Sequence, residues 1–95
     1  MAITEKIHIK NTKGLHARPA ANFVKLASSF SSKIQVIGPG RKVDGKSIMG
    51  MMMLAASHGT ELTIIASGQD EAAAINSLVK LAEDNFDRAE DDDLP

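Results

Sequence analysis

The segment from Gly14 to Ala20 contains the two side chains best suited to chemistry, His16 and Arg18. Histidine is the side chain most ready to act as a nitrogen nucleophile near neutral pH, and arginine presents a forked cation that suits phosphate oxygens. Both residues stand where a loop turns into a predicted helix, and none of positions 14–18 is a usual helix cap. The first helical amides therefore form a candidate anion site.

Phosphoryl transfer through a phosphohistidine is the chemistry that fits this arrangement. A ring nitrogen can attack a phosphoryl group, and the transfer needs mostly positioning and charge stabilisation, which the helix start and Arg18 offer. Pro19 suits a first helical turn, but a residue before proline avoids helical angles. The cap therefore lies either near His16 or at Arg18 itself. The plain alternative is a surface histidine beside an unrelated arginine.

Periodic apolar residues predict the elements that position this segment. Alternation predicts strands over residues 4–10, 33–37, 41–44 and 61–67. Helical spacing predicts helices over residues 17–30 and 48–56 and a last helix that starts near Asp70 and Glu71. The apolar stripe of the last helix consists of Ile75, Leu78, Val79, Ala82 and Phe86. Because apolar and polar residues alternate in three of the four strands, we expect helices on one face of an antiparallel or mixed sheet. This arrangement is an α+β two-layer sandwich.

Composition limits the class of protein. With 95 residues, 43% of them hydrophobic and 24% charged, the chain is expected to form one soluble globular domain. It has no cysteine, which excludes disulfides and thiolate metal sites. It shows no signal peptide and no run near the roughly 20 apolar residues of a membrane span, so we expect a cytoplasmic protein without membrane insertion.

Charge is distributed unevenly along the chain. Residues 1–46 include nine basic and two acidic residues, whereas residues 47–95 include two basic and ten acidic residues. The basic half predicts an anionic ligand or an acidic partner surface. The acidic end, residues 88–95, is expected to be a disordered tail outside a domain formed by residues 1–87.

Nucleic-acid binding is a different class of function that a basic half could serve. Recognition of unpaired bases needs exposed aromatic side chains. The candidates Phe23, Phe30 and Phe86 all lie on apolar stripes, and residues 38–41 do not form a Gly-x-x-Gly backbone clamp. We therefore expect no nucleic-acid partner.

The three histidines are not expected to form a metal site. His8 falls on the polar face of the first predicted strand, and His58 precedes a glycine in a predicted turn. Strand alternation argues against their convergence with His16. We therefore expect neither a metal nor a cofactor.

Two separate motifs resemble those of the HPr family, the histidine-containing phosphocarriers of the bacterial phosphoenolpyruvate-dependent phosphotransferase system. Residues 14–20 resemble its active-site signature, and residues 46–51 resemble its regulatory serine motif. The resemblance covers essentially residues 3–87. It implies an open-faced βαββαβα sandwich, with a four-stranded antiparallel sheet and three helices on one face.

The resemblance also implies roles for single residues. His16 matches the residue that is phosphorylated through Nδ1, and Arg18 matches the partner of the phosphoryl group. Ser47 matches the serine modified by a dedicated kinase/phosphorylase, although a serine at a helix start is by default an N-cap. Thr12 matches a small polar position near the active site.

A phosphocarrier of this family is a relay without turnover of its own. The resemblance implies that Enzyme I donates the phosphoryl group and that sugar-specific or regulatory proteins accept it from a monomeric carrier. Met51 and Leu54 are expected to fill the core, because one short helix cannot bury all its methionines. The predicted partner surface consists of Ala17, Ile48, Met49, Met52 and Met53.

The alternative is a regulatory module of the same family, of the nitrogen-related or incomplete-system type, in which phosphorylation controls partners and serves no sugar transporter. Residues 51–54 and 85–87 are similar to that branch. Residues 46–50 are more similar to the carbohydrate branch. The sequence leaves open the branch, the acceptors and the existence of a Ser47 kinase.

Overall fold

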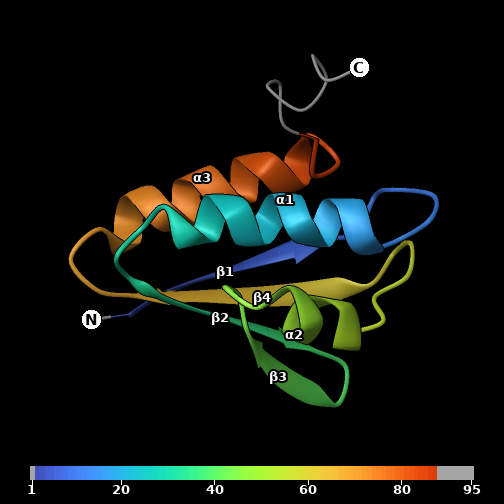
Figure 1. Cartoon of the computed structure of the whole chain (residues 1–95), viewed down its shortest axis with the longest axis horizontal. Helices are drawn as coiled ribbons and strands as arrows, with labels where there is room; N and C mark the ends of the chain where they lie inside the picture. Colours follow the sequence, from blue (N-terminus) through green and yellow to red (C-terminus); the bar gives the residue numbers. More distant parts are fainter. Residues whose placement is uncertain (1, 88–95) are drawn as a thin grey trace.

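Four strands and three helices form two layers in the computed structural model, which describes residues 2–87 (Figure 1). The acidic tail expected over residues 88–95 lies outside the described residues. Along the chain the elements are β1 (Ala2–His8), α1 (Ala17–Ser28), β2 (Lys33–Gly38), β3 (Arg41–Asp44), α2 (Ile48–Met53), β4 (Glu61–Ser67) and α3 (Glu71–Glu83).

The sheet has the strand order β1-β4-β2-β3, and every neighbouring pair is antiparallel. In this register Ile7 lies opposite Leu62, and Val36 lies opposite Ile64. All four of these side chains are buried on the helix side, whereas the residues between them are exposed or half-buried. The alternation in the sequence therefore correctly predicted a sheet with one covered face.

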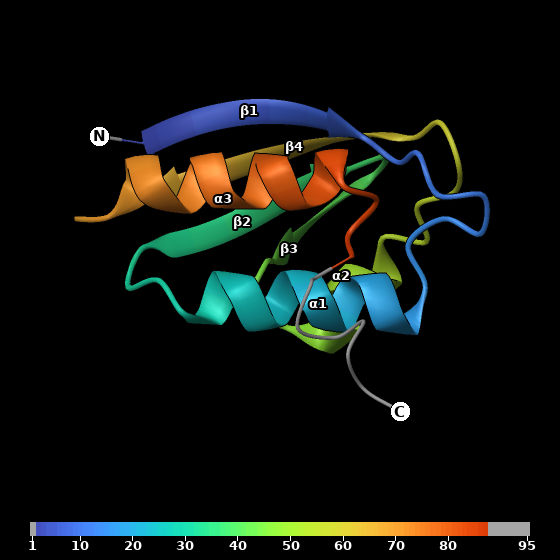
Figure 2. The same ribbon diagram turned by 90° about the horizontal axis from the view of Figure 1, so that it is seen from above.

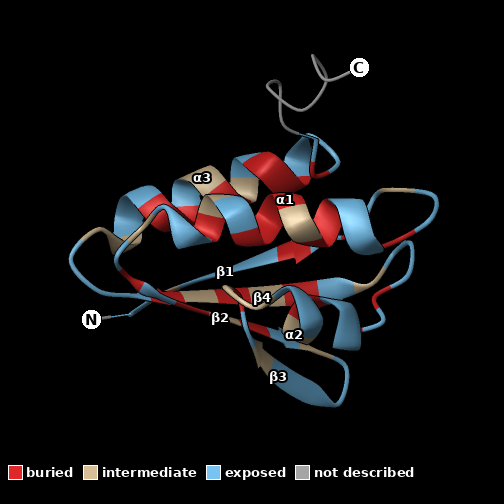
Figure 3. Ribbon diagram, in the orientation of Figure 1, coloured by how far each residue is buried: buried red, intermediate tan, exposed pale blue. Residues whose placement is uncertain are grey.

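Helices α1 and α3 lie side by side over that face (Figures 1 and 2). Helix α3 packs on β1 and β4, and the short α2 packs against α1 and β3. The buried residues of α1 and α3 form the stripes that face the sheet and each other (Figure 3). Several of them are alanines, which let the helices approach closely. No helix among residues 2–87 is long and apolar enough to cross a membrane.

The last helix is shorter than its apolar stripe predicts. Helix α3 ends at Glu83, and Phe86 lies in the following turn with a φ of 64°. The prediction that Phe86 belongs to the helical stripe is therefore wrong. Its side chain is nevertheless fully buried, with its ring centroid 6.4 Å from that of Phe23. Phe86 would be buried whether the helix continued to it or the chain turned back there, so the periodicity of apolar residues does not distinguish a helix from a turn at this position.

Helix α2 is also shorter than expected, because it ends at Met53 and not at position 56. Leu54 occupies the C-cap position, and Ala55 is left-handed with a φ of 50°, which no α-helix can contain. Strand β1 ends at His8, but Ile9 beyond it is buried as its alternation predicted. These differences change element ends and leave the fold class as expected.

Asp70 occupies the N-cap position of α3, but its side chain makes no capping hydrogen bond. The helix thus starts where the sequence predicts, but the carboxylate of Asp70 does not cap it. Instead, its carboxylate accepts hydrogen bonds from the backbone N–H of Ser31 at 2.9 Å, from the N–H of Ser32 at 2.9 Å and from the Ser32 hydroxyl. The Ser32 hydroxyl and the Ser31 amide lower the pKa of Asp70 from 3.8 to about 2. The carboxylate thus fastens the loop after α1 to the start of α3.

The Asp70→Asn variant should unfold at a lower urea concentration than the wild type at pH 7, because it loses a charged acceptor. The folded-state pKa of Asp70, about 2, lies below its ordinary value. Its contribution is therefore complete above about pH 4 and disappears as the pH falls through about 2. Urea titrations between pH 2 and 7 should show the two proteins converging in acid. Asp84→Asn, with the same charge change at an exposed position, controls for net charge, and a difference independent of pH would contradict the assignment.

Candidate functional site

His16 is the N-cap residue of α1. Its backbone is extended, with φ −99° and ψ −167°, and its carbonyl accepts the first helical hydrogen bond from Ala20 N at 3.0 Å. Its side chain is exposed and makes no capping hydrogen bond. Of the two cap positions that the sequence leaves open, the structure selects His16 and not Arg18. The imidazole therefore stands at the helix start with its ring accessible.

The first turn of α1 is built as an open, positively polarised helix end. It consists of exposed Ala17, exposed Arg18 and buried Pro19, and it contains no acidic residue. First-turn amides have no acceptor within the helix, and they carry the positive end of the helix dipole. Pro19 has no N–H to satisfy, and its fixed φ suits this position. The structure thus places His16 and the Arg18 cation on one helix start that can receive an anion.

The loop before His16 is held by the segment that follows α2. Leu15 N donates to the carbonyl of Ala56 at 2.8 Å, and the Leu15 side chain is buried. Gly14 has a φ of +72°, and a Cβ added there would lie 2.5 Å from the Ala56 oxygen. A residue with a side chain would therefore push the loop away. Ala56 cannot be identified as this acceptor from the sequence, because a backbone carbonyl has no signature there.

Two further hydrogen bonds fix the root of the same loop. Ile9 N donates to Thr60 O at 2.9 Å, and Gly59 N donates to Ile9 O at 2.7 Å. Thr12 is exposed in the turn of this loop. Residues 9–16 are therefore fixed to the connection between α2 and β4, which orients His16 relative to the sheet.

Ser47 is the N-cap of α2, and its Oγ accepts a hydrogen bond from Gly50 N at 3.0 Å. The plain capping role is thus present in the structure. The residue is half-buried. The neighbouring Lys46 donates from Nζ to Phe30 O at 2.8 Å and so connects the α2 start to the chain just after α1.

Four apolar side chains of α2 lie exposed beside α1. Met49 is 76% exposed, which is unusual for so large an apolar side chain. Met51 and Leu54 of the same segment are buried, as predicted. The exposed set consists of Ile48, Met49, Met52 and Met53.

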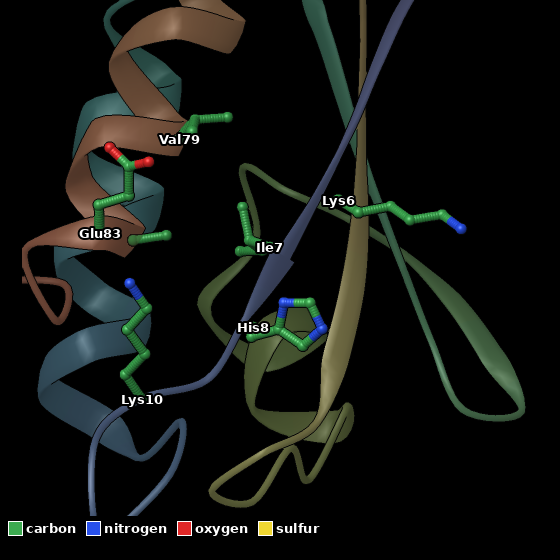
Figure 4. A pocket seen from close by; sticks show the side chains of 7 residues that line it. Lys6, Ile7, His8, Lys10, Val79 and Glu83 are labelled. Atoms are coloured by element: carbon green, nitrogen blue, oxygen red, sulfur yellow. The ribbon is translucent and has the colours of Figure 1, made fainter.

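The other two histidines lie elsewhere. His8 is exposed on β1, with Nε2 at 3.4 Å from the carboxylate of Glu61, and His58 is exposed in a turn, as expected. A shallow pocket between β1 and α3 has His8 at its edge and does not include His16 (Figure 4). It is lined by Lys6, Ile7, His8, Lys10, Val79, Ala82 and Glu83. The open helix end, and not this pocket, holds the residues with suitable chemistry.

Comparison with known proteins matches residues 3–84 to the family described as PTS HPr component phosphorylation site. The phosphocarrier protein HPr of Pseudomonas aeruginosa is 46% identical over 90% of this chain and 96% of its own. The structure of HPr-C-His from Thermoanaerobacter tengcongensis has a TM-score of 0.84, with 51% identity over 88% of this chain and 94% of that one. Crh of Bacillus subtilis, described as a dimer with a swapped domain, has a TM-score of 0.71, with 42% identity over 90% of this chain and 99% of that one.

A Gly14→Ala substitution should destabilise the protein more than Gly40→Ala does. Both glycines are left-handed, with φ of +72° and +77°, so both substitutions carry a backbone cost of roughly 1–2 kcal/mol. Only at position 14 does the new Cβ meet backbone, which adds roughly 1–3 kcal/mol; at Gly40 nothing lies within 4 Å. Urea unfolding of both variants measures the difference. Equal losses in the free energy of unfolding would show that the loop moves away from Ala56 without cost.

Proposed function

The chain belongs to the HPr family of the bacterial phosphotransferase system, and from this premise we propose that it carries phosphoryl groups on His16. The donor is phospho-Enzyme I, and the acceptors are sugar-specific or regulatory proteins. Proteins of this family are phosphocarriers and not catalytic enzymes, so the chain acts as a relay. The observation that carries the proposal is the exposed His16 imidazole at the start of a helix that its own side chain does not cap.

The relay uses one ring nitrogen of His16, which the family resemblance assigns as Nδ1. The nitrogen lone pair attacks phosphorus, and the bond between phosphorus and the donor breaks, with its electron pair leaving on the donor. The acceptor then attacks the same phosphorus, and the bond to His16 breaks in turn. His16 is regenerated, so the carrier is not consumed.

The helix start and Arg18 provide the charge stabilisation that this transfer needs. The moving phosphoryl group keeps its negative oxygens throughout, and little covalent work is left to the protein. First-turn amides and the positive dipole end attract those oxygens without a change of conformation. The Arg18 guanidinium adds a permanent charge with several N–H donors.

The partner surface combines the start of α1 with the exposed face of α2. The two helices are in contact, and α2 lies beside the N-terminal half of α1 (Figures 1 and 2). Exposed methionines adapt to different apolar surfaces, which suits a carrier that must dock to a donor and to several acceptors. Ala17 is exposed at the junction and belongs to this surface. The monomeric state of the carrier stays a prediction.

Regulation through Ser47 is the second part of the proposal. Ser47 stands directly before the exposed Ile48 and Met49. A phosphate on its hydroxyl, transferred by a kinase/phosphorylase, adds about −1.5 to −2 charge beside the apolar partner surface. Because a charge at an apolar interface is costly to desolvate, phosphorylation weakens docking. The similarity to Crh, which is described as a catabolite repression protein, favours a purely regulatory role as the second candidate.

Incubation with phosphoenolpyruvate and Enzyme I should add one acid-labile phosphate to the wild type and none to His16→Ala, because the substitution removes the nucleophile. His8→Ala and His58→Ala are matched controls, since both remove an exposed imidazole and leave His16 in place, and both should be labelled fully. Intact-protein mass spectrometry before and after acid treatment measures the label. Labelling of His16→Ala would refute the assignment.

Ser47→Asp should bind Enzyme I about tenfold more weakly than the wild type, a loss of about 1.4 kcal/mol, because of the charge it adds beside Met49. Ser47→Ala is the control for the cap alone: it loses the hydrogen bond from Gly50 and about 1 kcal/mol of stability, but should keep its affinity. Calorimetric titration measures both. Equal affinities of Ser47→Asp and the wild type would count against regulation by charge.

A further inference from the structure

The turn after α3 contains two consecutive residues with left-handed backbones, Asn85 at φ 61° and Phe86 at φ 64°. Asparagine tolerates this region, but a bulky phenylalanine there is a true outlier and carries strain. Such strain persists only where the surroundings hold it, and it is concentrated at functional sites. The family match ends at residue 84, so this turn lies just beyond the matched residues.

Two asparagine side chains bind the two carbonyls of this turn. Asn11 donates from Nδ2 to Asn85 O at 3.0 Å, and Asn22 donates from Nδ2 to Phe86 O at 2.8 Å. Asn22 is buried within α1, where a polar side chain is retained only with a partner. The ring of Phe86 packs against Phe23, the next residue of α1.

These two asparagines bracket His16, since one stands five residues before it and the other six residues after it. Asn11 lies in the loop that leads to His16, and its own carbonyl accepts from Gly14 N at 3.0 Å. Asn22 lies on α1. The turn is thus bonded to both sides of the junction at which His16 stands. The hydrogen bond from Leu15 to Ala56 comes from a different segment, so two separate segments fix the junction.

We propose that Asn11 and Asn22 are positioning residues for phosphoryl transfer: through the Asn85–Phe86 turn they fix the angle between the His16 loop and α1. The inference rests on the proposed function of His16. His16 is the N-cap residue of α1, so the position of its imidazole relative to a docked donor depends on the angle between the loop and the helix. An error of 1 Å in the position of a reacting group can cost about 100-fold in rate.

The test is the rate at which phospho-Enzyme I labels Asn11→Ala and Asn22→Ala, each under conditions in which urea titration shows it fully folded. We expect about a tenfold lower maximal rate and a much smaller change in the KM for phospho-Enzyme I, because the α2 part of the docking surface is untouched. Asn76→Ala removes an exposed amide from α3 and should keep the wild-type rate.

Nuclear magnetic resonance provides a readout independent of phosphoryl transfer. The backbone amide signals of Leu15, His16 and Ala17 should shift in Asn11→Ala and stay in place in Asn76→Ala. Wild-type rates and unshifted amides in folded Asn11→Ala would overturn the inference while leaving the proposed function intact. A failure of the proposed function looks different, because the wild type itself then accepts no phosphate.

Discussion

The close approach of the His16 loop to Ala56 is the contact on which the site depends. The Leu15 amide reaches the Ala56 carbonyl only because Gly14 has no Cβ and adopts a left-handed φ. Ala56 stands three residues after the end of α2, so the same contact sets the start of α1 relative to α2. The proposed nucleophile, at the start of one helix, and the proposed apolar docking face on the other are thereby held in one arrangement.

The three helix starts use their capping groups differently, and this difference singles out α1. Ser47 caps α2 with its hydroxyl, whereas the carboxylate of Asp70 binds the loop after α1 in place of its own helix. At α1 His16 occupies the cap position, and its side chain makes no capping hydrogen bond. A missing cap costs about 1 kcal/mol. The buried stripe of α1 supplies the stability of that helix, so the helix does not depend on a capping bond from His16.

Local patterns predicted most of the fold because the signals are local. Strands Arg41–Asp44 and Glu61–Ser67 have the predicted bounds, and alternation correctly identified the covered face. The errors are at helix ends: a left-handed Ala55 ends α2 early, and Phe86 leaves the helix yet reaches the core. In both places the chain adopts a backbone angle that periodicity does not encode.

By itself, the sequence determined the chemical groups of the site, because His16, Arg18 and the lack of a side-chain cap can be read from consecutive residues. It also determined the covered face of the sheet, because side chains alternate along a strand. Only the tertiary structure decided that His16 is the cap residue, that Asp70 binds another loop, and that Asn11 and Asn22 hold a turn more than 60 residues away in the chain. These contacts end on backbone groups from distant segments, and every residue type has the same backbone groups.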